Sequence, residues 1–189
     1  MAISALSIHP TKNFVATASD DMTWKVWTFA GELLLSGEGH KDWVCGIHFH
    51  PKGNHLATSS GDSTIKFWDF VNAKIVYTFT DHIQPVWSIG INDTGDFLVS
   101  ASMDHTCKLF DLNTGKNRYT FRGHVDSVNH VVYQPYSNIF ASASADKTVS
   151  LWDMKSGLCV QTFYGHLNSI NHCNFTPRVT LKHYNPQNL

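Results

Sequence analysis

Short apolar stretches recur along the chain, and each ends at a group of turn-forming residues. Between residues 43 and 79 they cover 43–49, 55–59, 64–68 and 74–79, and the first turn reads Pro-Lys-Gly-Asn, which suits a tight reversal. The same order returns at 1–8, 14–19, 23–28 and 33–35, at 86–91, 97–101, 106–110 and 117–121, and at 128–133, 139–143, 148–152 and 158–163. No helical period competes with it, so the pattern predicts an all-β chain of four-stranded meanders.

The third predicted strand of each unit is largely apolar on both faces. In 64–68, Ile65 and Phe67 fall on one face and Trp68 on the other, whereas a sheet with one solvated face would alternate apolar and polar residues. Burial on both faces requires each sheet to lie between two neighbours. Short sheets stacked face to face around an axis form a β-propeller, which is the fold that we predict.

Two sequence markers repeat with one period. The last aromatic residues of the third strands, Trp27, Trp68, Phe110 and Trp152, are spaced by 41, 42 and 42 residues. The pairs Gly39-His40, Asp81-His82, Gly123-His124 and Gly165-His166 are each 42 residues apart. Two independent markers at one period indicate a repeat protein.

The spacing of these markers around Ser-x-Asp and Trp-Asp resembles the WD-repeat family, which implies a propeller of four-stranded blades, commonly seven. Departures are Thr28 in place of the last Asp, Phe110 in place of Trp, and Asp81 in place of Gly. The expected organisation is a partial propeller over 1–177, with blades at about 1–36, 43–80, 86–122 and 128–164, one strand of a fifth at 170–175, and a non-repeat tail at 178–189.

Seven blades would need about 294 residues at this repeat length, against the 189 of this chain. We therefore expect a truncated form, such as an alternative product, of a longer protein. Open blade edges are prone to pairing, so self-association is a further expectation.

The charge of the chain bears on its class of partner, and its cysteines bear on the cellular compartment. The 14 basic and 15 acidic residues are dispersed and give a net charge of −1, so nucleic acid and membrane surfaces are not expected as partners. The four cysteines lie in strand-like segments, without a C-x-x-C pair or a secretory signal. Buried free thiols in a reducing, intracellular compartment are the expectation.

Each repeat contains residue types found in catalytic triads. The sets are His40, Ser60, Asp62 and Trp68; His82, Ser102 and Asp104; His124, Ser144, Asp146 and Trp152; and, in the first repeat, Ser19, Asp21 and Trp27. A catalytic site is normally unique, whereas these sets recur, so no catalysis is expected. The family resemblance implies structural networks in which Asp accepts from His, His contacts Ser, and Ser meets the Trp indole. Phe110 has no N–H, so Ser102 is expected to lack its last bond.

Metal and cofactor sites are not expected either. Although His172-Cys173 is the nearest approach to a ligand pair, no second pair lies at zinc-site spacing. The glycines lie in turns and form no phosphate-binding loop.

In WD-repeat proteins, partners often dock on the face built by the loops before the first strands and by the residue before the turn Asp. The resemblance carries this role to Trp43, Trp87, Asn129, Asp20 and Met103, with Cys45, Pro85 and Ser127 beside them. Aromatic anchors are frequent hot spots, which favours Trp43 and Trp87. Ordinary packing within the blade is the alternative for each residue.

These features favour a non-enzymatic scaffold that binds other proteins. The alternatives are an enzyme that uses the central channel, which would need converging polar residues, and a nucleic-acid reader, which the neutral charge disfavours. The stretch 102–129 further resembles WD-repeat proteins of the ciliary central apparatus. This implies a place in the cytoplasm, cytoskeleton and axoneme of cilia or flagella, with axonemal central-apparatus components as partners in microtubule assembly and motility. WD-repeat adaptors of the katanin regulatory subunit or dynein assembly factor type remain alternatives.

Overall fold

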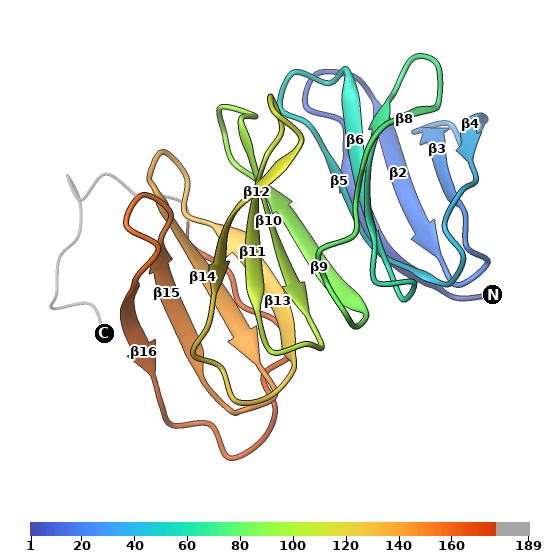
Figure 1. The fold of residues 1–189 in the computed structure, drawn as a ribbon. Helices are drawn as coiled ribbons and strands as arrows, with labels where there is room; N and C mark the ends of the chain where they lie inside the picture. Colours follow the sequence, from blue (N-terminus) through green and yellow to red (C-terminus); the bar gives the residue numbers. More distant parts are fainter. Residues whose placement is uncertain (177–189) are drawn as a thin grey trace, which may run out of the picture.

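In a computed structural model, residues 1–176 are described, and they form four antiparallel sheets that follow one another in an open arc (Figure 1). Blade 1 consists of β1 (Ile3–Ile8), β2 (Phe14–Ser19), β3 (Trp24–Thr28) and β4 (Leu33–Gly37), and blade 2 of β5 (Val44–Phe49), β6 (His55–Ser60), β7 (Ile65–Asp69) and β8 (Lys74–Phe79). Blade 3 consists of β9 (Val86–Ile91), β10 (Phe97–Ser102), β11 (Cys107–Asp111) and β12 (Lys116–Phe121), and blade 4 of β13 (Val128–Tyr133), β14 (Ile139–Ser144), β15 (Val149–Asp153) and β16 (Cys159–Phe163). The predicted all-β propeller architecture is confirmed.

The turn between the second and third strands is held by one aspartate in each blade. In blade 2, Asp62 Oδ1 accepts hydrogen bonds from the Thr64 backbone N–H at 2.9 Å and from the Thr64 hydroxyl at 2.7 Å. Between them, Ser63 has a φ of 65°, a left-handed conformation that is costly for a residue with a Cβ. The side-chain bonds offset this cost and close the turn. The turn thereby places the other carboxylate oxygen of Asp62 beside His40.

The core lies between the blades. Trp24 of blade 1 packs edge-on against Trp68 of blade 2, with ring centroids 5.3 Å apart. Phe79 of blade 2 contacts Phe110 of blade 3 at 4.5 Å, and Phe121 of blade 3 lies 5.6 Å from Trp152. Each inner sheet therefore has apolar side chains buried on both faces, as the two-sided apolar pattern predicted.

The outer faces of the first and last blades lie open among the described residues. On blade 1, Ile3 is 66% exposed and Leu6 65% exposed. On blade 4, Phe163 is 51% exposed, although the residues at the same repeat position, Phe79 and Phe121, are buried. The difference arises because a following blade covers Phe79 and Phe121.

The chain continues past β16 into the start of the predicted fifth blade, and one prediction, the burial of all four cysteines, needs correction. Residues 170–175, predicted as the first strand of a fifth blade, begin beside blade 4, where the Ile170 backbone N–H donates to the Ser144 carbonyl at the end of β14 at 3.0 Å, and they form no strand ladder among the described residues. The same segment also contacts β13, where the Asn129 side-chain amide donates to the Ile170 carbonyl at 3.0 Å. Of the cysteines, only Cys107 is fully buried, and Cys159 is exposed, because β16 is an outer strand. Residue 177 and the predicted tail 178–189 lie outside the described residues.

Candidate interaction surface

A chain of buried hydrogen bonds crosses blade 2 from Trp68 to Asp62. The Trp68 indole N–H donates to Thr58 Oγ1 at 2.8 Å, Thr58 Oγ1 lies 2.7 Å from His40 Nε2, and His40 Nδ1 lies 3.0 Å from Asp62 Oδ2. A neutral imidazole with its proton on Nδ1 satisfies the whole chain, because it donates to the carboxylate and accepts from the hydroxyl. In blade 4, Trp152, Ser142, His124 and Asp146 repeat this arrangement.

The hydroxyl residue of the network is not the one predicted. Thr58 occupies the place expected for Ser60, and in blades 3 and 4 Ser100 and Ser142 occupy the places expected for Ser102 and Ser144. In the hairpin, Trp68 lies opposite Leu56, and Ser60 lies two residues, about 6.6 Å, beyond Thr58 along the strand. Ser60 instead donates to the Asp42 carbonyl and accepts the Asp62 backbone N–H, both at 3.1 Å.

The first and third blades have incomplete versions of the network. In blade 3, Phe110 provides no donor, and the hydroxyl of Ser100 lies 2.7 Å from His82 Nε2 and 3.4 Å from the Lys108 carbonyl. The missing bond was predicted, although for Ser102 and not for Ser100. In blade 1, the Trp27 indole N–H donates to the Thr17 hydroxyl at 3.0 Å. The Asp21 carboxylate accepts a hydrogen bond from the Thr23 hydroxyl and lies 3.9 Å from Lys25 Nζ. Ser19 accepts the Asp21 backbone N–H at 3.2 Å.

The networks are closed to substrate and their carboxylates are held ionised. Burial would raise the pKa of Asp62, but hydrogen bonds from His40 and Thr64 outweigh burial and hold the pKa well below its usual value. The pKa of Asp104 is lowered in the same way by His82 and Thr106. Thr58 is 0% exposed and the His40 side chain 1% exposed. These groups satisfy one another inside the blade, and no reacting molecule can reach the hydroxyl.

A hollow of about 800 Å³ opens where the first strands of all the blades begin. One repeat position contributes one residue from each of five segments, with four residue types among them: Ser4, Cys45, Trp87, Asn129 and Asn171. We call this site the tryptophan hollow, because Trp43 and Trp87 both line it. Of the five predicted partner-surface residues, the structure brings Trp43, Trp87, Asn129 and Asp20 together here, while Met103, 43% exposed, is not part of the lining.

The two tryptophans of the hollow are positioned differently. The Trp43 ring lies against Gly61, since a Cβ on that glycine would come within 2.5 Å of the ring, and the side chain is 38% exposed. The Trp87 indole N–H donates to the Ser127 hydroxyl of the next blade at 3.1 Å, and this hydroxyl lies 3.1 Å from Asn129 Oδ1. The Trp43 ring therefore packs against the backbone of a glycine, whereas Trp87 is hydrogen-bonded to polar side chains of the next blade.

Further polar residues of the hollow were not predicted from sequence. The Asn129 amide donates to Ser169 Oγ at 3.2 Å, and Ser169 Oγ donates to Asn171 Oδ1 at 3.3 Å. Ser169 and Asn171 follow Ser127 and Asn129 by 42 residues each, so the repeat period itself was the signal that could have found them. Pro85 has a structural role, because its carbonyl accepts the Met103 backbone N–H at 2.9 Å.

The electrostatic environment of the hollow is negative. Burial raises the pKa of the Cys45 thiol to about 12, and the carboxylates of Asp42, Asp20 and Asp62 add to the rise. Asp20 is exposed, and within residues 1–176 its carboxylate makes no hydrogen bond or ion pair to another side chain. The hollow therefore offers an accessible negative charge beside two aromatic rings.

A second hollow of about 680 Å³ opens at the opposite ends of the first strands, among Ser7, His48, Gly90, Val132 and Asn174. Here the rings of His130 and His172 lie 3.9 Å apart, and burial together with His172 lowers the pKa of His130 to about 4. Cys173 Sγ lies 3.9 Å from His130 Nδ1. Among the described residues, no group of three His, Cys, Asp or Glu side chains is arranged to hold a metal ion.

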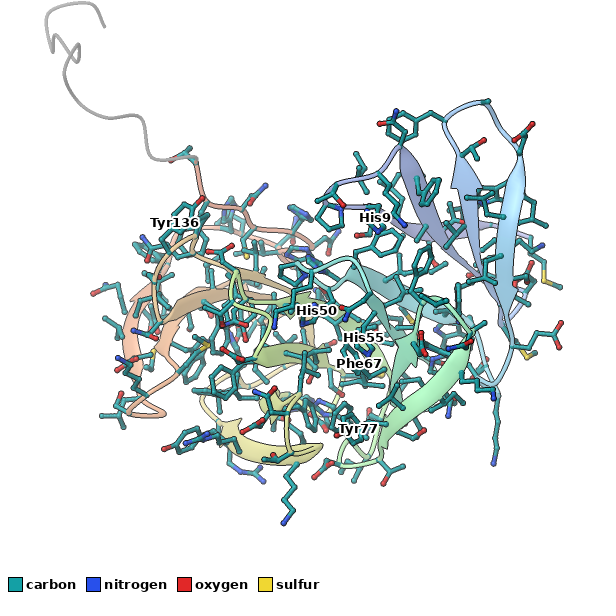
Figure 2. The ribbon with its side chains drawn as sticks, turned by 90° about the horizontal axis from the view of Figure 1, so that it is seen from above. His9, His50, His55, Phe67, Tyr77 and Tyr136 are labelled. Carbon is teal, nitrogen blue, oxygen red and sulfur yellow. The ribbon has the colours of Figure 1, made fainter. Side chains whose placement is uncertain are left out.

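Two histidines in the turns after the first strands, at the same end of the blades as the second hollow, form hydrogen bonds to the next blade. His50 Nδ1 accepts the Lys52 backbone N–H at 3.1 Å, so its proton lies on Nε2, which donates to the Gly95 carbonyl of blade 3 at 2.9 Å. His9 lies 3.0 Å from the Gly53 carbonyl of blade 2 in the same way. Figure 2 shows His50, His55, Phe67 and Tyr77 following one another across blade 2, with His55 stacked on Phe67 at 4.8 Å.

Comparison with known proteins places this architecture in context. The repeat family described as "WD domain, G-beta repeat" matches residues 1–28, 31–69, 73–111 and 115–153. The chain is 52% identical over 43 residues to "Flagellar WD repeat-containing protein Pf20" of Chlamydomonas reinhardtii, and the matched stretch covers 22% of this chain and 7% of that protein. It is 47% identical over 50 residues to "Sperm-associated antigen 16 protein" of Mus musculus, and this second match covers 26% of this chain and 8% of that protein.

The resemblance found in the sequence is confirmed by the family match and by these partial relatives, although the matched stretches span less than a tenth of either relative. In the part of the chain that the structure describes, no helix has the length and apolar character needed to cross a membrane.

Proposed function

The chain belongs to the WD-repeat family, and on that premise we propose that it is a non-enzymatic scaffold that binds other proteins in the axoneme of motile cilia and sperm flagella. Its contribution there is to central-pair microtubule assembly and motility. The printed names of the two relatives, one flagellar and one sperm-associated, support the location.

The observation that carries the binding role is the tryptophan hollow. Its wall takes the same repeat position from every blade, yet the residues there differ, from Ser4 and Cys45 to Trp87 and Asn129. Positions that only pack the blade keep a large aromatic side chain, such as the buried Trp68, Phe110 and Trp152. A surface that varies on a constant frame suits recognition of one particular partner.

The buried networks support the absence of enzymatic activity. Each one recurs in a neighbouring blade, and each has its hydroxyl sealed inside the sheet, as Thr58, Ser100 and Ser142 show with 0% exposure. A nucleophile needs access to its substrate, so the geometry of these groups suits stability and not catalysis.

Proximity labelling in ciliated cells tests the proposal. The chain is fused to a biotin ligase, and the expected result is labelling of central-pair proteins that Trp43→Ala reduces at least about tenfold, as for a hot-spot aromatic. Tyr164→Ala is the matched control, because Tyr164 is an exposed aromatic side chain on blade 4 that does not line the hollow. Labelling of another microtubule-linked complex would favour the adaptor alternative, and labelling insensitive to Trp43→Ala would move the binding surface elsewhere.

A further inference from the structure

The lining of the tryptophan hollow combines aromatic faces with uncompensated negative charge. None of its lining residues is Lys, Arg or His. Asp20 reaches the hollow from the turn of blade 1, and Asp42 immediately precedes Trp43 in blade 2. The Asp42 carboxylate accepts the Trp43 backbone N–H at 2.9 Å, and its charge helps to raise the pKa of the Cys45 thiol in the lining. A ligand that enters the hollow meets negative charge from two blades.

The aromatic faces complete a site for a cation. An indole is the best aromatic partner for a cationic group that lies within about 6 Å of its centroid. Trp43 is supported from behind by Gly61, so its ring stays in place while part of its surface remains exposed. Trp87 is held by Ser127. Both rings are fixed before a ligand arrives, which lowers the entropic cost of binding.

We propose that the tryptophan hollow receives an arginine side chain from an extended segment of the partner, with the guanidinium against an indole face and Asp20 as its counter-charge. This rests on the proposed function and names the chemistry of its partner. Arginine fits better than lysine, because a planar guanidinium stacks on an aromatic ring and donates two parallel hydrogen bonds to a carboxylate. At about 800 Å³ the hollow also has room for residues on either side of the arginine.

The polar chain that continues from Trp87 and Ser127 suits the backbone of such a segment. Asn129, Ser169 and Asn171 present amide and hydroxyl groups in a row that crosses from blade 4 to the following segment. These groups both donate and accept, as a peptide backbone requires. An acidic segment would instead bring like charge to Asp20 and Asp42, which is costly.

Nuclear magnetic resonance with a small probe tests the inference on the full chain. N-acetyl-arginine methylamide is titrated while the indole N–H signals of Trp43 and Trp87 are followed, after assignment with Trp43→Phe. The expected result is a saturable shift with a Kd on the order of millimolar. N-acetyl-citrulline methylamide, which has nearly the same shape without the charge, is expected to give no saturable shift. Equal shifts with both probes, or none with the arginine probe, would overturn the proposal.

Variants separate the counter-charge from a general effect of net charge. Asp20→Asn is expected to weaken the arginine probe about threefold to tenfold, whereas Glu32→Gln, an equal loss of charge outside the hollow, leaves the affinity unchanged. Equal weakening by both variants would contradict the role of Asp20. A saturable shift with N-acetyl-glutamate methylamide, or concentration-dependent shifts without any probe, would assign the hollow to an acidic partner or a second copy.

The failure of this inference and that of the proposed function are distinguishable. If the arginine probe fails but Trp43→Ala still abolishes proximity labelling, only the chemistry assigned to the partner is wrong. If the probe binds as expected but labelling does not depend on Trp43, the hollow binds arginine and the scaffold uses another surface.

Discussion

The indole N–H of Trp68 donates to the buried hydroxyl of Thr58 at 2.8 Å, and the same hydroxyl lies 2.7 Å from His40. This one hydroxyl joins the strand that carries the tryptophan to the loop that enters the blade. Blade 4 has the complete arrangement around Ser142, while blade 3 lacks the indole donor because Phe110 replaces the tryptophan. Blades 3 and 4 of one molecule therefore allow the contribution of the indole hydrogen bond to stability to be compared directly.

Ser142→Ala is expected to destabilise the protein more than Ser100→Ala. Both substitutions remove the hydroxyl that His124 or His82 contacts, but only Ser142→Ala also leaves a buried indole N–H without its acceptor. The difference is expected to be about 1–3 kcal/mol in free energy of unfolding. Urea unfolding of the two variants measures it. Equal losses would mean that the Trp152 bond contributes nothing to stability.

Stability is expected to fall in acid because of the carboxylates that face the histidines. The pKa of Asp62 is lowered in the folded protein from its ordinary value of 3.8, and that of Asp104 likewise. A carboxyl with a lowered pKa stabilises the fold above its unfolded pKa, and this contribution is lost as the pH falls through the folded pKa. The loss therefore begins near pH 4 and grows below it.

Asp62→Asn tests this origin of the acid sensitivity. Urea midpoints are measured between pH 2 and pH 7, where the variant is expected to be less stable at neutral pH and to show a flatter decline in acid. Glu32→Gln, at an exposed turn, serves as the control and should keep the decline of the wild-type chain. An unchanged slope in Asp62→Asn would assign the acid sensitivity to other groups.

Gly53→Ala is expected to cost more stability than Gly31→Ala. Both glycines have positive φ, 72° and 90°, so both substitutions carry a backbone strain of about 1–2 kcal/mol. Only at Gly53 would the new Cβ also meet a neighbour, His9 Cε1 at 2.5 Å, whereas nothing lies within 4 Å at Gly31. Thermal unfolding compares the two. Combining Gly53→Ala with His9→Ala should show non-additive losses, because both disturb one contact between blades.

Gly61→Ala is expected to displace the ring of Trp43 with little cost to the fold. The new Cβ would come within 2.5 Å of the ring, which can rotate toward solvent. The measurement is the tryptophan emission of Gly61→Ala against wild type, where a shift to longer wavelength is expected, together with reduced partner labelling. Gly90→Ala is the control, because its nearest neighbour lies at 3.5 Å.

Thiol reactivity in the folded protein is expected to differ among the cysteines. Cys159 is exposed and should react first with an aromatic disulfide reagent. Cys107 is buried, which raises the pKa of its thiol, and burial raises that of Cys173 to about 11. Cys159→Ser should remove the fast phase of the reaction, and a fast phase that persists would contradict the exposed position of β16.

The number of blades, the strands of each blade and the positions that face a neighbour can be read from the sequence. This was readable because the chemistry repeats: Trp68 and Trp152 recur at one spacing, and residues such as Ile65 and Phe67 make both faces of a strand apolar. Period and two-sided burial are local properties, so they are visible without knowing how the sheets stack.

The hydroxyl that joins each network, and the loop residues that form one site, depend on how the strands pair and the blades pack. Thr58 and Ser60 are both hydroxyl residues on one strand, and only the register that places Trp68 opposite Leu56 brings the indole to Thr58. The tryptophan hollow likewise gathers Asp20, Trp43, Trp87 and Asn129 from four blades. Such a gathering depends on how the blades are tilted around the axis, which packing between the sheets sets and no local pattern encodes.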